Sequence, residues 1–547
     1  MKLRAEAEAR HRALFLFSSC DIVESKLNRE RSCLSRLLIQ FWFSFGRKNM
    51  KTAYIGGIIL NGTEDMKPEH MSVIVENGRI VEILPADGLL PSDCEIVNIK
   101  GLYLMPGLIN LHVHLNSGGK PSGKKKQPED YVRLVKVATS NALTGEIVRS
   151  MSRGYAYMEL QSGVTTIRTV GGISDYDGKI RNEIEEGVRL REKFTEDRLP
   201  GMKKHNLRSS LRAVRTGFTR IPAGPFAPDG VGAALRGSAA GSAMPGPRIL
   251  TANMGISVPG GHVAGSLAYP AHTAAEAVSF VHKIAESRPD LIKLMVTGGI
   301  MDAETEGAPG VLKMSPEIIR AACEEAHKLG LPVAAHTEST QGVIEALRGG
   351  VDTIEHGALP TDEMMELFHQ KGASLVTTIS PIMPMALLDT AQTHVRPMDR
   401  RNAGIVLRGV IECARRALRE GIPVGLGTDS GCPFVTQYDM WRELQYFHNF
   451  CGVSEAEALY TATLGNAKIA GLGDETGSIE PGKAADFLIT AGNPLENLRA
   501  LRRPRMIVAR GVQITNPILK KDVEIEQALD ELLRYTYEDL DDILAGD

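Results

Sequence analysis

The pattern of hydrophobic and polar positions changes character at residue 107. From there to about residue 430, short apolar runs alternate with stretches that have the 3.6-residue periodicity of amphipathic helices. The eight runs are LINLHVHL (108–115), VTTIRTV (164–170), RILTAN (248–253), LIKLMV (291–296), PVAAH (332–336), DTIEH (352–356), SLVTT (374–378) and PVGLGTD (423–429). Eight strands separated by helices predict an α/β fold in which a parallel sheet closes into a (β/α)8 TIM barrel.

Strand-like runs also flank this segment on both sides. Residues 52–104 contain several, with ENG (76–78) as a hairpin turn, and two more occupy 477–490 and 504–514. We therefore predict a barrel domain over 107–474 and a small composite β-sandwich domain built from 50–106 and 475–520. The acidic segment 521–547 is predicted to form a C-terminal amphipathic helix over 524–544.

Two segments do not fit either domain. Residues 1–49 are rich in Arg and Lys, and their longest apolar stretch, LLIQFWFSF, is too short to span a bilayer. We expect a disordered extension there. The interval between the second and third strands is too long for one βα unit, and within it residues 189–243 hold 11 Lys or Arg against 4 Asp or Glu. A disordered surface insertion is the main interpretation, and a basic binding loop is the alternative.

Composition narrows the functional classes. Hydrophobic residues make up 43% of the chain, charged residues 24%, and the net charge is −3, which is ordinary for a globular protein and predicts no general affinity for nucleic acid or a membrane. The seven cysteines are scattered without a CxxC pair, as expected of reduced thiols in a cytoplasmic protein. The expected partner is a small-molecule substrate, and the sequence leaves a homo-oligomer open.

The first barrel strand ends in two histidines separated by one residue. Alternate side chains of a strand face the same way, so His112 and His114 are expected to point to one place and suggest a metal site. Other polar residues stand at the ends of later strands, and the C-terminal ends of parallel barrel strands share one rim. The residues expected to converge there are His112, His114, Lys293, His336, His356 and Asp429.

Taken singly, each of these residues has a simpler explanation. A histidine is often a satisfied core residue, Lys293 would reach water, and Asp429 in GTDSG would cap a turn. Other histidines serve as a comparison, since His282, His327 and His369 lie in helical patterns and His205 lies in the insertion. The joint placement of six polar residues at strand ends favours a functional site.

The stretches PGLINLHVHL, LIKLMVTGG, PVAAHTES, DTIEHGA, GLGTDSG and GSIEPGKAADFLI, in this order, resemble the metal-dependent amidohydrolase superfamily. The resemblance covers roughly residues 52–515 without the insertion. It is strongest to the prolidase-like and imidazolonepropionase-related branch, in which GGH (here Gly260, Gly261 and His262) precedes the strand with the lysine.

The resemblance implies two divalent metal ions, zinc first, with manganese or cobalt as alternatives. His112 and His114 would bind one ion, His336 and His356 the other, and an N-carboxylated Lys293 would bridge both. Asp429, also a metal ligand, would act as general base and then general acid toward a metal-bridging hydroxide. His262 would hold the oxyanion or a polar group of the substrate.

The implied activity is hydrolysis of an amide or peptide-like C–N bond in a dipeptide, an N-acyl amino acid or a related small molecule. The alternative is a deaminase or cyclic-amide hydrolase that acts on a small nitrogen heterocycle. Deaminase relatives carry an acid three residues after the fifth-strand histidine, where this chain has Ser339, with Glu338 one residue earlier. A non-catalytic scaffold would have lost ligands, and all six are present.

Overall fold

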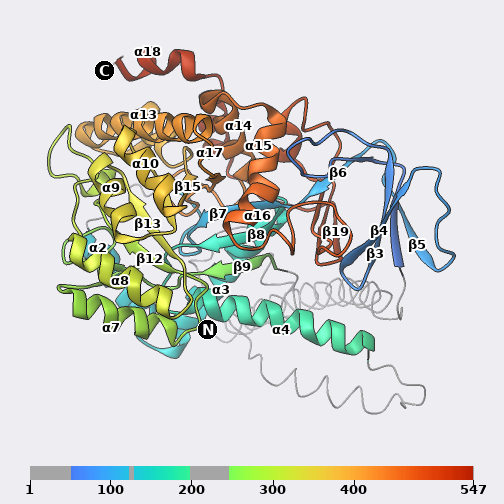
Figure 1. Cartoon of the computed structure of the whole chain (residues 1–547), viewed down its shortest axis with the longest axis horizontal. Coiled ribbons are helices and arrows are strands. Elements are labelled where there is room, and N and C mark those ends of the chain that lie inside the picture. The colour runs from blue at the N-terminus through green and yellow to red at the C-terminus, as the bar shows by residue number, and fades with distance from the viewer. Residues whose placement is uncertain (1–50, 122–127, 197–245, 546–547) are drawn as a thin grey trace, which may run out of the picture. The chain divides into compact units, whose positions relative to one another are not determined.

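The computed structural model describes residues 51–121, 128–196 and 246–545. Apart from residues 190–196, the features below belong to one compact unit, whose described residues are 51–121, 128–189 and 246–545 (Figure 1). The predicted N-terminal extension, 1–49, lies outside the described residues, as does 197–243 of the predicted insertion. The insertion begins later than expected, because helix α4 (Tyr176–Glu196) continues through residues 189–196.

The strands that flank the central segment form two mainly antiparallel sheets. One has the order β4-β3-β1-β5 and the other β19-β18-β17-β6-β2. Their strands are β1 (Lys51–Ile55), β2 (Ile58–Ile59), β3 (Met71–Glu76), β4 (Arg79–Pro85), β5 (Cys94–Asn98), β6 (Tyr103–Pro106), β17 (Phe487–Thr490), β18 (Met506–Ala509) and β19 (Val512–Thr515). Asn77 and Gly78, both at positive φ, turn β3 into β4 as the ENG motif predicts.

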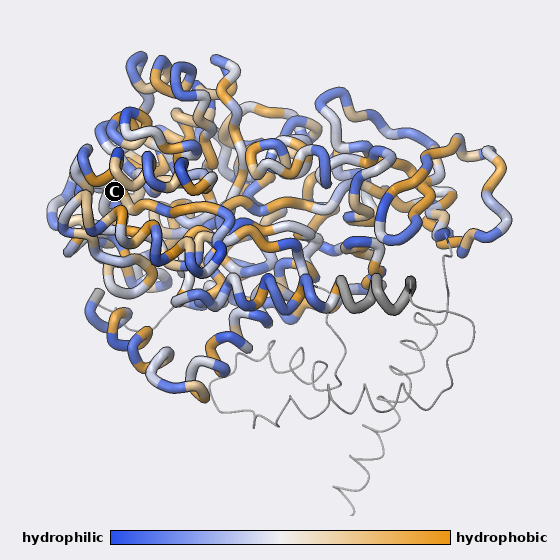
Figure 2. Tube along the Cα trace, turned by 60° about the horizontal axis from the view of Figure 1, so that its bottom comes forward, coloured by the Kyte–Doolittle hydropathy of each residue, from blue (hydrophilic) through white to orange (hydrophobic). Residues whose placement is uncertain are grey.

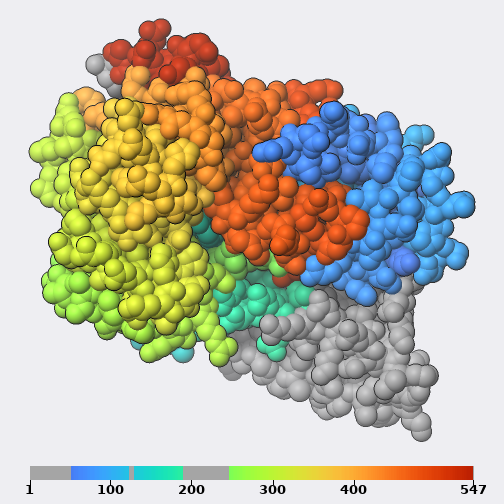
Figure 3. Space-filling view, in the orientation of Figure 1, coloured from blue at the N-terminus to red at the C-terminus, as the bar shows by residue number. Residues whose placement is uncertain are grey.

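The second of these sheets contains residues from both sides of the central segment. β17 pairs antiparallel with β6, with Phe487 opposite Pro106. Tyr54 and Phe487 meet edge to face, 5.5 Å between ring centroids, inside a hydrophobic cluster that both sheets share. Figure 3 shows the blue N-terminal segment beside the orange C-terminal segment. The two flanks therefore fold together, as the strand pattern predicts.

All eight strands predicted for the barrel are present, in two parallel sheets. The orders are β7-β8-β9 and β11-β10-β12-β13-β14-β15-β16. The strands are β7 (Leu108–Val113), β8 (Val164–Thr169), β9 (Arg248–Thr251), β10 (Gly255–Ser257), β11 (Ala268–Pro270), β12 (Ile292–Met295), β13 (Val333–Thr337), β14 (Thr353–His356), β15 (Ser374–Thr377) and β16 (Val424–Leu426). The short strands β10 and β11 were not predicted.

Backbone hydrogen bonds connect the outer strands of the two parallel sheets. The Asp429 N–H donates to the His112 carbonyl over 2.8 Å, and the His114 N–H donates to the Ser430 carbonyl over 2.9 Å. The first and last strands of the segment therefore meet where β7 ends. On the other side, the Asp290 N–H donates to the Thr251 carbonyl just before β12.

Helices follow most of the parallel strands (Figure 1). They are α2 (Pro128–Ala138), α3 (Ala142–Gln161), α4, α7 (Ala274–Ala285), α8 (Pro316–Lys328), α9 (Thr340–Gly349), α10 (Asp362–Lys371), α11 (Ile382–Leu387), α12 (Thr390–Thr393), α13 (Pro397–Arg419), α14 (Met440–Cys451), α15 (Glu455–Tyr460) and α16 (Asn466–Ile469). Hydrophobic and hydrophilic positions interleave along these elements (Figure 2). Apolar side chains of the parallel strands and their helices form the largest core cluster.

The acidic C-terminal segment differs from the single helix that was predicted. It forms α17 (Val523–Leu532), the turn η4 (Tyr537–Asp539) and α18 (Leu540–Ala545). The break occurs because Thr536 starts a new turn with a capping box to Asp539. None of the helices in the described residues combines the length and apolarity that a bilayer crossing requires.

Candidate metal and catalytic site

The two histidines of β7 face a common partner. His112 is buried, and its Nε2 atom lies 3.5 Å from Asp429 Oδ1, while His114 Nε2 lies 3.1 Å from the same oxygen. Gly427 lets this arrangement form, since a Cβ there would sit 2.3 Å from His112 Cβ. The opposite ring nitrogen of His114 donates to the Gly171 carbonyl over 2.7 Å, which leaves Nε2 of this residue facing the site.

The second histidine pair comes from β13 and β14. His336 Nδ1 and His356 Nε2 lie 2.9 Å apart, and both rings are buried. The His356 ring is also 4.8 Å from the His112 ring, which brings the two pairs together. Burial and neighbouring positive charge hold the pKa of both His336 and His356 well below the usual value. Both rings are therefore neutral near pH 7, as metal binding requires.

Asp429 lies in the loop after β16, three residues beyond the end of the strand. Its φ of 56° and the φ of 68° at His356 are left-handed conformations that these residue types adopt at a cost. Such strain is typical of functional sites. Burial opposes ionisation of Asp429, but His112 and His114 hold its pKa well below the usual range. The carboxylate is therefore available as a base at neutral pH.

Lys293 lies on β12 as predicted, but not at the strand end. It is the second residue of a four-residue strand and pairs in register with Ala334, two residues before His336. The side chain is 1% exposed, and its Nζ atom has no hydrogen-bond partner. Burial lowers the pKa of Lys293 to about 8, and its charge in turn lowers the pKa of His112. Lys293 thus lies deeper in the sheet than the strand end, and its charge acts on His112, His336 and His356.

A buried ion pair behind His112 was missed by sequence reasoning. His112 Nδ1 donates to Glu355 Oε2 over 2.8 Å, and Arg168 donates to Glu355 Oε1 over 2.7 Å. Burial opposes the charge, yet Arg168 and Lys293 keep the pKa of Glu355 far below its usual range. The pair fixes the ring of His112 so that Nε2 faces Asp429. The available signal was a charged residue inside each of two apolar strands.

His262 stands beside the cluster, and its partner Asp302 was also missed. The rings of His262 and His336 are stacked with 4.3 Å between centroids and 5° between planes. His262 Nδ1 donates to Asp302 Oδ2 over 2.5 Å, and the Gly299 N–H donates to the same oxygen over 2.9 Å. The turn η1 (Ile300–Asp302) that follows VTGG therefore positions the histidine.

Glu338 is a further acid near the site. Its Oε2 atom is buried without a hydrogen-bond partner. Burial, followed by the negative charges of Asp302 and Asp429, raises the pKa of Glu338 to about 8. Ser339 has a structural task instead, because its hydroxyl accepts from the Gly342 N–H at the start of α9.

The donors in this cluster fit divalent cations. Ligand atoms of His112, His356 and Asp429 all lie within 4.8 Å of one another, and His114 and His336 contact members of that trio. Neutral imidazoles and a carboxylate are ligands that zinc accepts. The amine of Lys293 has no hydrogen-bond partner. An anionic carbamate formed on this amine would find its partners in bound cations.

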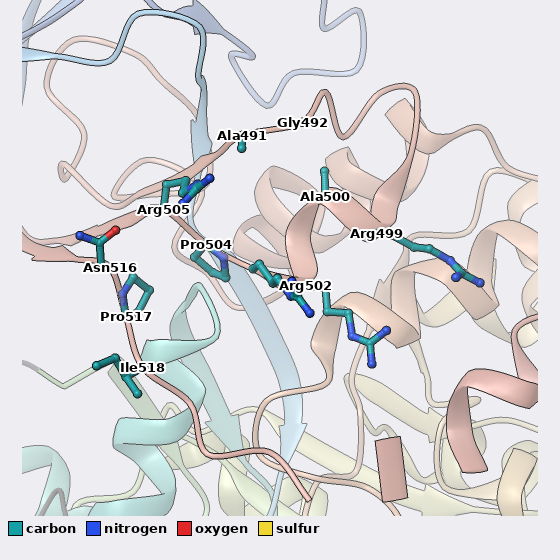
Figure 4. Close-up of a pocket in the computed structure, with 11 residues that line it drawn as sticks. Ala491, Gly492, Arg499, Ala500, Arg502, Pro504, Arg505, Asn516, Pro517 and Ile518 are labelled. Carbon is teal, nitrogen blue, oxygen red and sulfur yellow. The ribbon is translucent and has the colours of Figure 1, made fainter. Parts of the chain in front are cut away.

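An arginine-rich cavity lies elsewhere, beside η3 (Leu498–Arg502) and the loops next to β17, β18 and β19 (Figure 4). Its volume is about 630 Å³. Four arginines line it, Arg499, Arg502, Arg503 and Arg505, and none of the predicted site residues does. It is therefore separate from the histidine cluster.

A parallel α/β fold with histidines and an aspartate gathered where its strands end defines a class of hydrolases, and comparison with known proteins identifies the family. The model of the amidohydrolase family matches residues 202–514, more than half of the chain. The protein therefore belongs to the amidohydrolase family.

Individual relatives agree with this assignment. An imidazolonepropionase of Pseudomonas putida is 23% identical over 457 residues, 82% of this chain and 95% of that enzyme. An ochratoxinase of Aspergillus niger is 27% identical over 220 residues, 40% of this chain and 44% of its own length. The chain thus aligns with less than half of that relative.

Solved structures extend the likeness to most of the chain. A prolidase-like protein of Bifidobacterium longum is 30% identical with a TM-score of 0.69, over 89% of this chain and all of that one. A Xaa-Pro dipeptidase has a TM-score of 0.65 at 22% identity, over 85% of this chain and 100% of its own, and shares the fold.

Proposed function

We propose that this protein is a metal-dependent hydrolase that cleaves an amide or peptide-like C–N bond in a small substrate. One observation carries the proposal: ligand atoms of His112, His356 and Asp429 meet within 4.8 Å at a buried site. The unpartnered amine of Lys293, on the same sheet as His356, supports it. Burying so many titratable groups at one place costs free energy, and groups of this kind cluster at functional sites.

The proposed cofactor is a pair of divalent cations, with zinc as the preferred ion. His112 and His114 would hold one ion and His336 and His356 the other, with Asp429 as a further ligand and N-carboxylated Lys293 as the bridge. When bound, the ions would acidify a water molecule and polarise the scissile carbonyl. Burial favours the carbamate because a neutral amine is the form that reacts with carbon dioxide.

The chain itself would supply the proton transfers. Asp429 is ionised and lies within 3.5 Å of both β7 histidines, so it would take the proton of the attacking water. The same carboxyl group would then deliver that proton to the departing amine. His262, held by Asp302, would contact the carbonyl oxygen or another polar group of the substrate.

The proposed substrates are dipeptides, N-acyl amino acids and related small amides. Likeness to a prolidase-like protein and a Xaa-Pro dipeptidase favours this class. The alternative is cyclic-amide hydrolysis or deamination of a nitrogen heterocycle, which the long alignment with an imidazolonepropionase favours. The use of Ser339 as a helix cap, in place of an acid, speaks against deamination.

The proposal includes the architecture that would hold this site. The two parallel sheets would be parts of one closed (β/α)8 barrel over 107–474, joined by the hydrogen bonds between His112 and Asp429 and between His114 and Ser430. The two other sheets would form a β-sandwich from 50–106 and 475–520. A cytoplasmic location, with no nucleic-acid or membrane partner, completes the proposal.

The decisive experiment combines metal analysis with a substrate screen. The purified protein is analysed by inductively coupled plasma mass spectrometry and assayed with dipeptides, N-acyl amino acids and lactams. Two metal ions per chain with peptide cleavage is the expected result. Ammonia release from a heterocycle would favour the alternative, and full activity in the metal-free protein would overturn the proposal.

A further inference from the structure

Four arginines give the arginine-rich cavity beside η3 a concentration of positive charge. They are Arg499, Arg502, Arg503 and Arg505, and the described residues that line the cavity include no acidic side chain. The cluster contrasts with the chain as a whole, whose net charge is −3. Because like charges repel one another, gathering them around one cavity costs free energy unless an anion binds there. The cavity therefore has the charge of an anion-binding site.

Of the four arginines, Arg502 alone has its charge compensated by acids of the described chain. It donates to Glu526 Oε2 over 2.6 Å and to Asp530 Oδ2 over 2.9 Å, so α17 satisfies this guanidinium. The other three side chains are exposed, and none of them has an ion pair or a side-chain hydrogen bond within the described residues. They belong to Arg499, Arg503 and Arg505. Three guanidinium groups are therefore free to hold a ligand.

Backbone hydrogen bonds fix the segments that carry these arginines. The lining residues come from three stretches, 491–492, 499–505 and 516–518. The Arg505 N–H donates to the Ile489 carbonyl of β17 over 2.8 Å, and the Asn516 N–H donates to the Arg505 carbonyl over 2.9 Å. Arg505 is thus held between β17 and the residues after β19. Binding would need to order only side chains here, which keeps its entropy cost low.

The cavity also has an apolar part. Pro504, Pro517 and Ile518 line it together with the arginines (Figure 4). The Ile518 side chain is 87% exposed, among the most exposed of the large hydrophobic residues in the described chain. The volume of about 630 Å³ is within the range of small-molecule sites. A ligand with both an anionic and an organic part would therefore use the lining better than an inorganic anion.

Phosphate is the anion that suits three free guanidinium groups. A guanidinium donates two parallel N–H bonds to phosphate oxygens, and a phosphate ester carries about −1.5 to −2 charge near pH 7. A carboxylate carries a single charge, so one carboxylate would leave most of the cluster uncompensated. A diphosphate offers more charge and more acceptor oxygens than either group, and it therefore matches the cluster best.

We propose that the arginine-rich cavity binds a phosphorylated organic molecule of the class of a nucleoside diphosphate. In this complex, Arg499, Arg503 and Arg505 donate to the phosphate oxygens. The organic part contacts Pro517 and Ile518. The site is separate from the histidine cluster, so the proposal does not depend on the hydrolytic reaction.

Calorimetric titration of the purified full chain tests the proposal, with ADP, AMP, adenosine, inorganic diphosphate and citrate as probes. ADP should bind most tightly. AMP, with one phosphate fewer, and inorganic diphosphate, without the organic part, should each bind about tenfold more weakly, because each loses part of the contacts. Adenosine should show no binding at concentrations of ADP that saturate the site, and citrate, whose charge is on carboxylates, should bind more weakly than ADP.

Paired variants locate the ligand. Arg503→Ala combined with Arg505→Ala should weaken ADP binding about 10- to 100-fold, since two charged donors are lost. The matched control combines Arg320→Ala with Arg419→Ala, which removes the same charge at exposed arginines of α8 and α13 and should bind ADP as the wild type does. Lysine at positions 503 and 505 keeps the charge without the fork and should give an intermediate affinity. Circular dichroism melting shows whether each variant is folded.

Several outcomes would overturn the site. An unchanged ADP affinity in the folded alanine variant would place the ligand elsewhere, as at the histidine cluster, and no binding of ADP to the wild type would mean that the cavity takes no such ligand. Equal weakening in the control variant would reduce the effect to the overall charge of the protein. Inorganic diphosphate or citrate that binds as tightly as ADP would contradict the assignment to an organic phosphate.

Discussion

His262 and Asp302 form a dyad beside the histidine cluster, with 2.5 Å between Nδ1 and Oδ2. An ionised carboxylate only accepts hydrogen bonds, so Nδ1 of His262 is the donor to Asp302, and Nε2 lies outside this contact. The Gly299 N–H holds the same carboxylate oxygen, and the ring lies flat against His336. The dyad therefore has a fixed orientation next to the proposed metal ligands.

Asp302→Ala is expected to lower kcat/KM about 10- to 100-fold, because His262 loses the group that orients it. Asp302→Asn keeps an acceptor at the same place and should retain more activity. Steady-state kinetics with a substrate found in the screen measures both. If Asp302 acts through His262, the double variant with His262→Ala should be no slower than His262→Ala alone.

The positions of the proposed ligands were predictable because each lies in or just after an apolar run. In β7, β13 and β14, the runs of buried residues and the shared direction of parallel strands placed His112, His336 and His356 toward corresponding strand ends. The order of the runs also predicted that the flanking strands would share a sheet, which the β6–β17 pairing confirms. These features depend on local pattern and on the direction of parallel strands.

The supporting residues were not predictable in the same way. Arg168 and Glu355 are 187 positions apart, and their pairing depends on which strands become neighbours. Asp302 is 40 residues from His262 and reaches it only through the turn η1. Lys293 was expected at a strand end, but β12 ends two residues later, at Met295. The sequence alone does not show how deep in the sheet a residue with such a long side chain lies.

Lys293→Ala is expected to remove at least one metal ion per chain and most of the turnover. The variant has no amine to carboxylate, so the proposed bridge between the two ions would be lost. Metal content by mass spectrometry, measured together with kcat, tests this. Lys283→Ala, which removes an exposed lysine whose amine lies over the Tyr269 ring, is the control and should keep both ions. A fully active Lys293→Ala protein would disprove the two-metal site.

Glu355→Gln is expected to destabilise the fold by about 3 to 5 kcal/mol, because it leaves the buried guanidinium of Arg168 without its counter-charge. Urea unfolding at pH 7 measures the loss. The control is Glu363→Gln, which breaks the ion pair with Arg348 at side chains that are 51% and 50% exposed. That pair should contribute less than about 1 kcal/mol. Equal losses in the two variants would contradict a special role for the buried pair.

Acid is expected to weaken the docking of α17 through Glu526. This side chain pairs with Arg442 of α14 at 3.1 Å and with Arg502 at 2.6 Å. Burial opposes its charge, but Lys521 and Arg442 lower the pKa of Glu526 to about 2 from an ordinary value of 4.5. A lowered folded-state pKa gives stability that is complete above pH 4.5 and lost as the pH falls toward 2.

Comparison with Glu526→Gln isolates the contribution of Glu526 to stability. The comparison is needed because burial raises the pKa of nearby Asp439, so the effect of Asp439 on stability changes with pH in the opposite direction. The wild type should be more stable than the variant at pH 7, and the difference should shrink between pH 4.5 and pH 2. Arg442 and Arg502 both lie over the Trp441 ring, so Trp441 fluorescence in a Trp42→Phe background reports the docking. A stability difference that stays constant down to pH 2 would mean that the ionised form of Glu526 does not hold α17 in place.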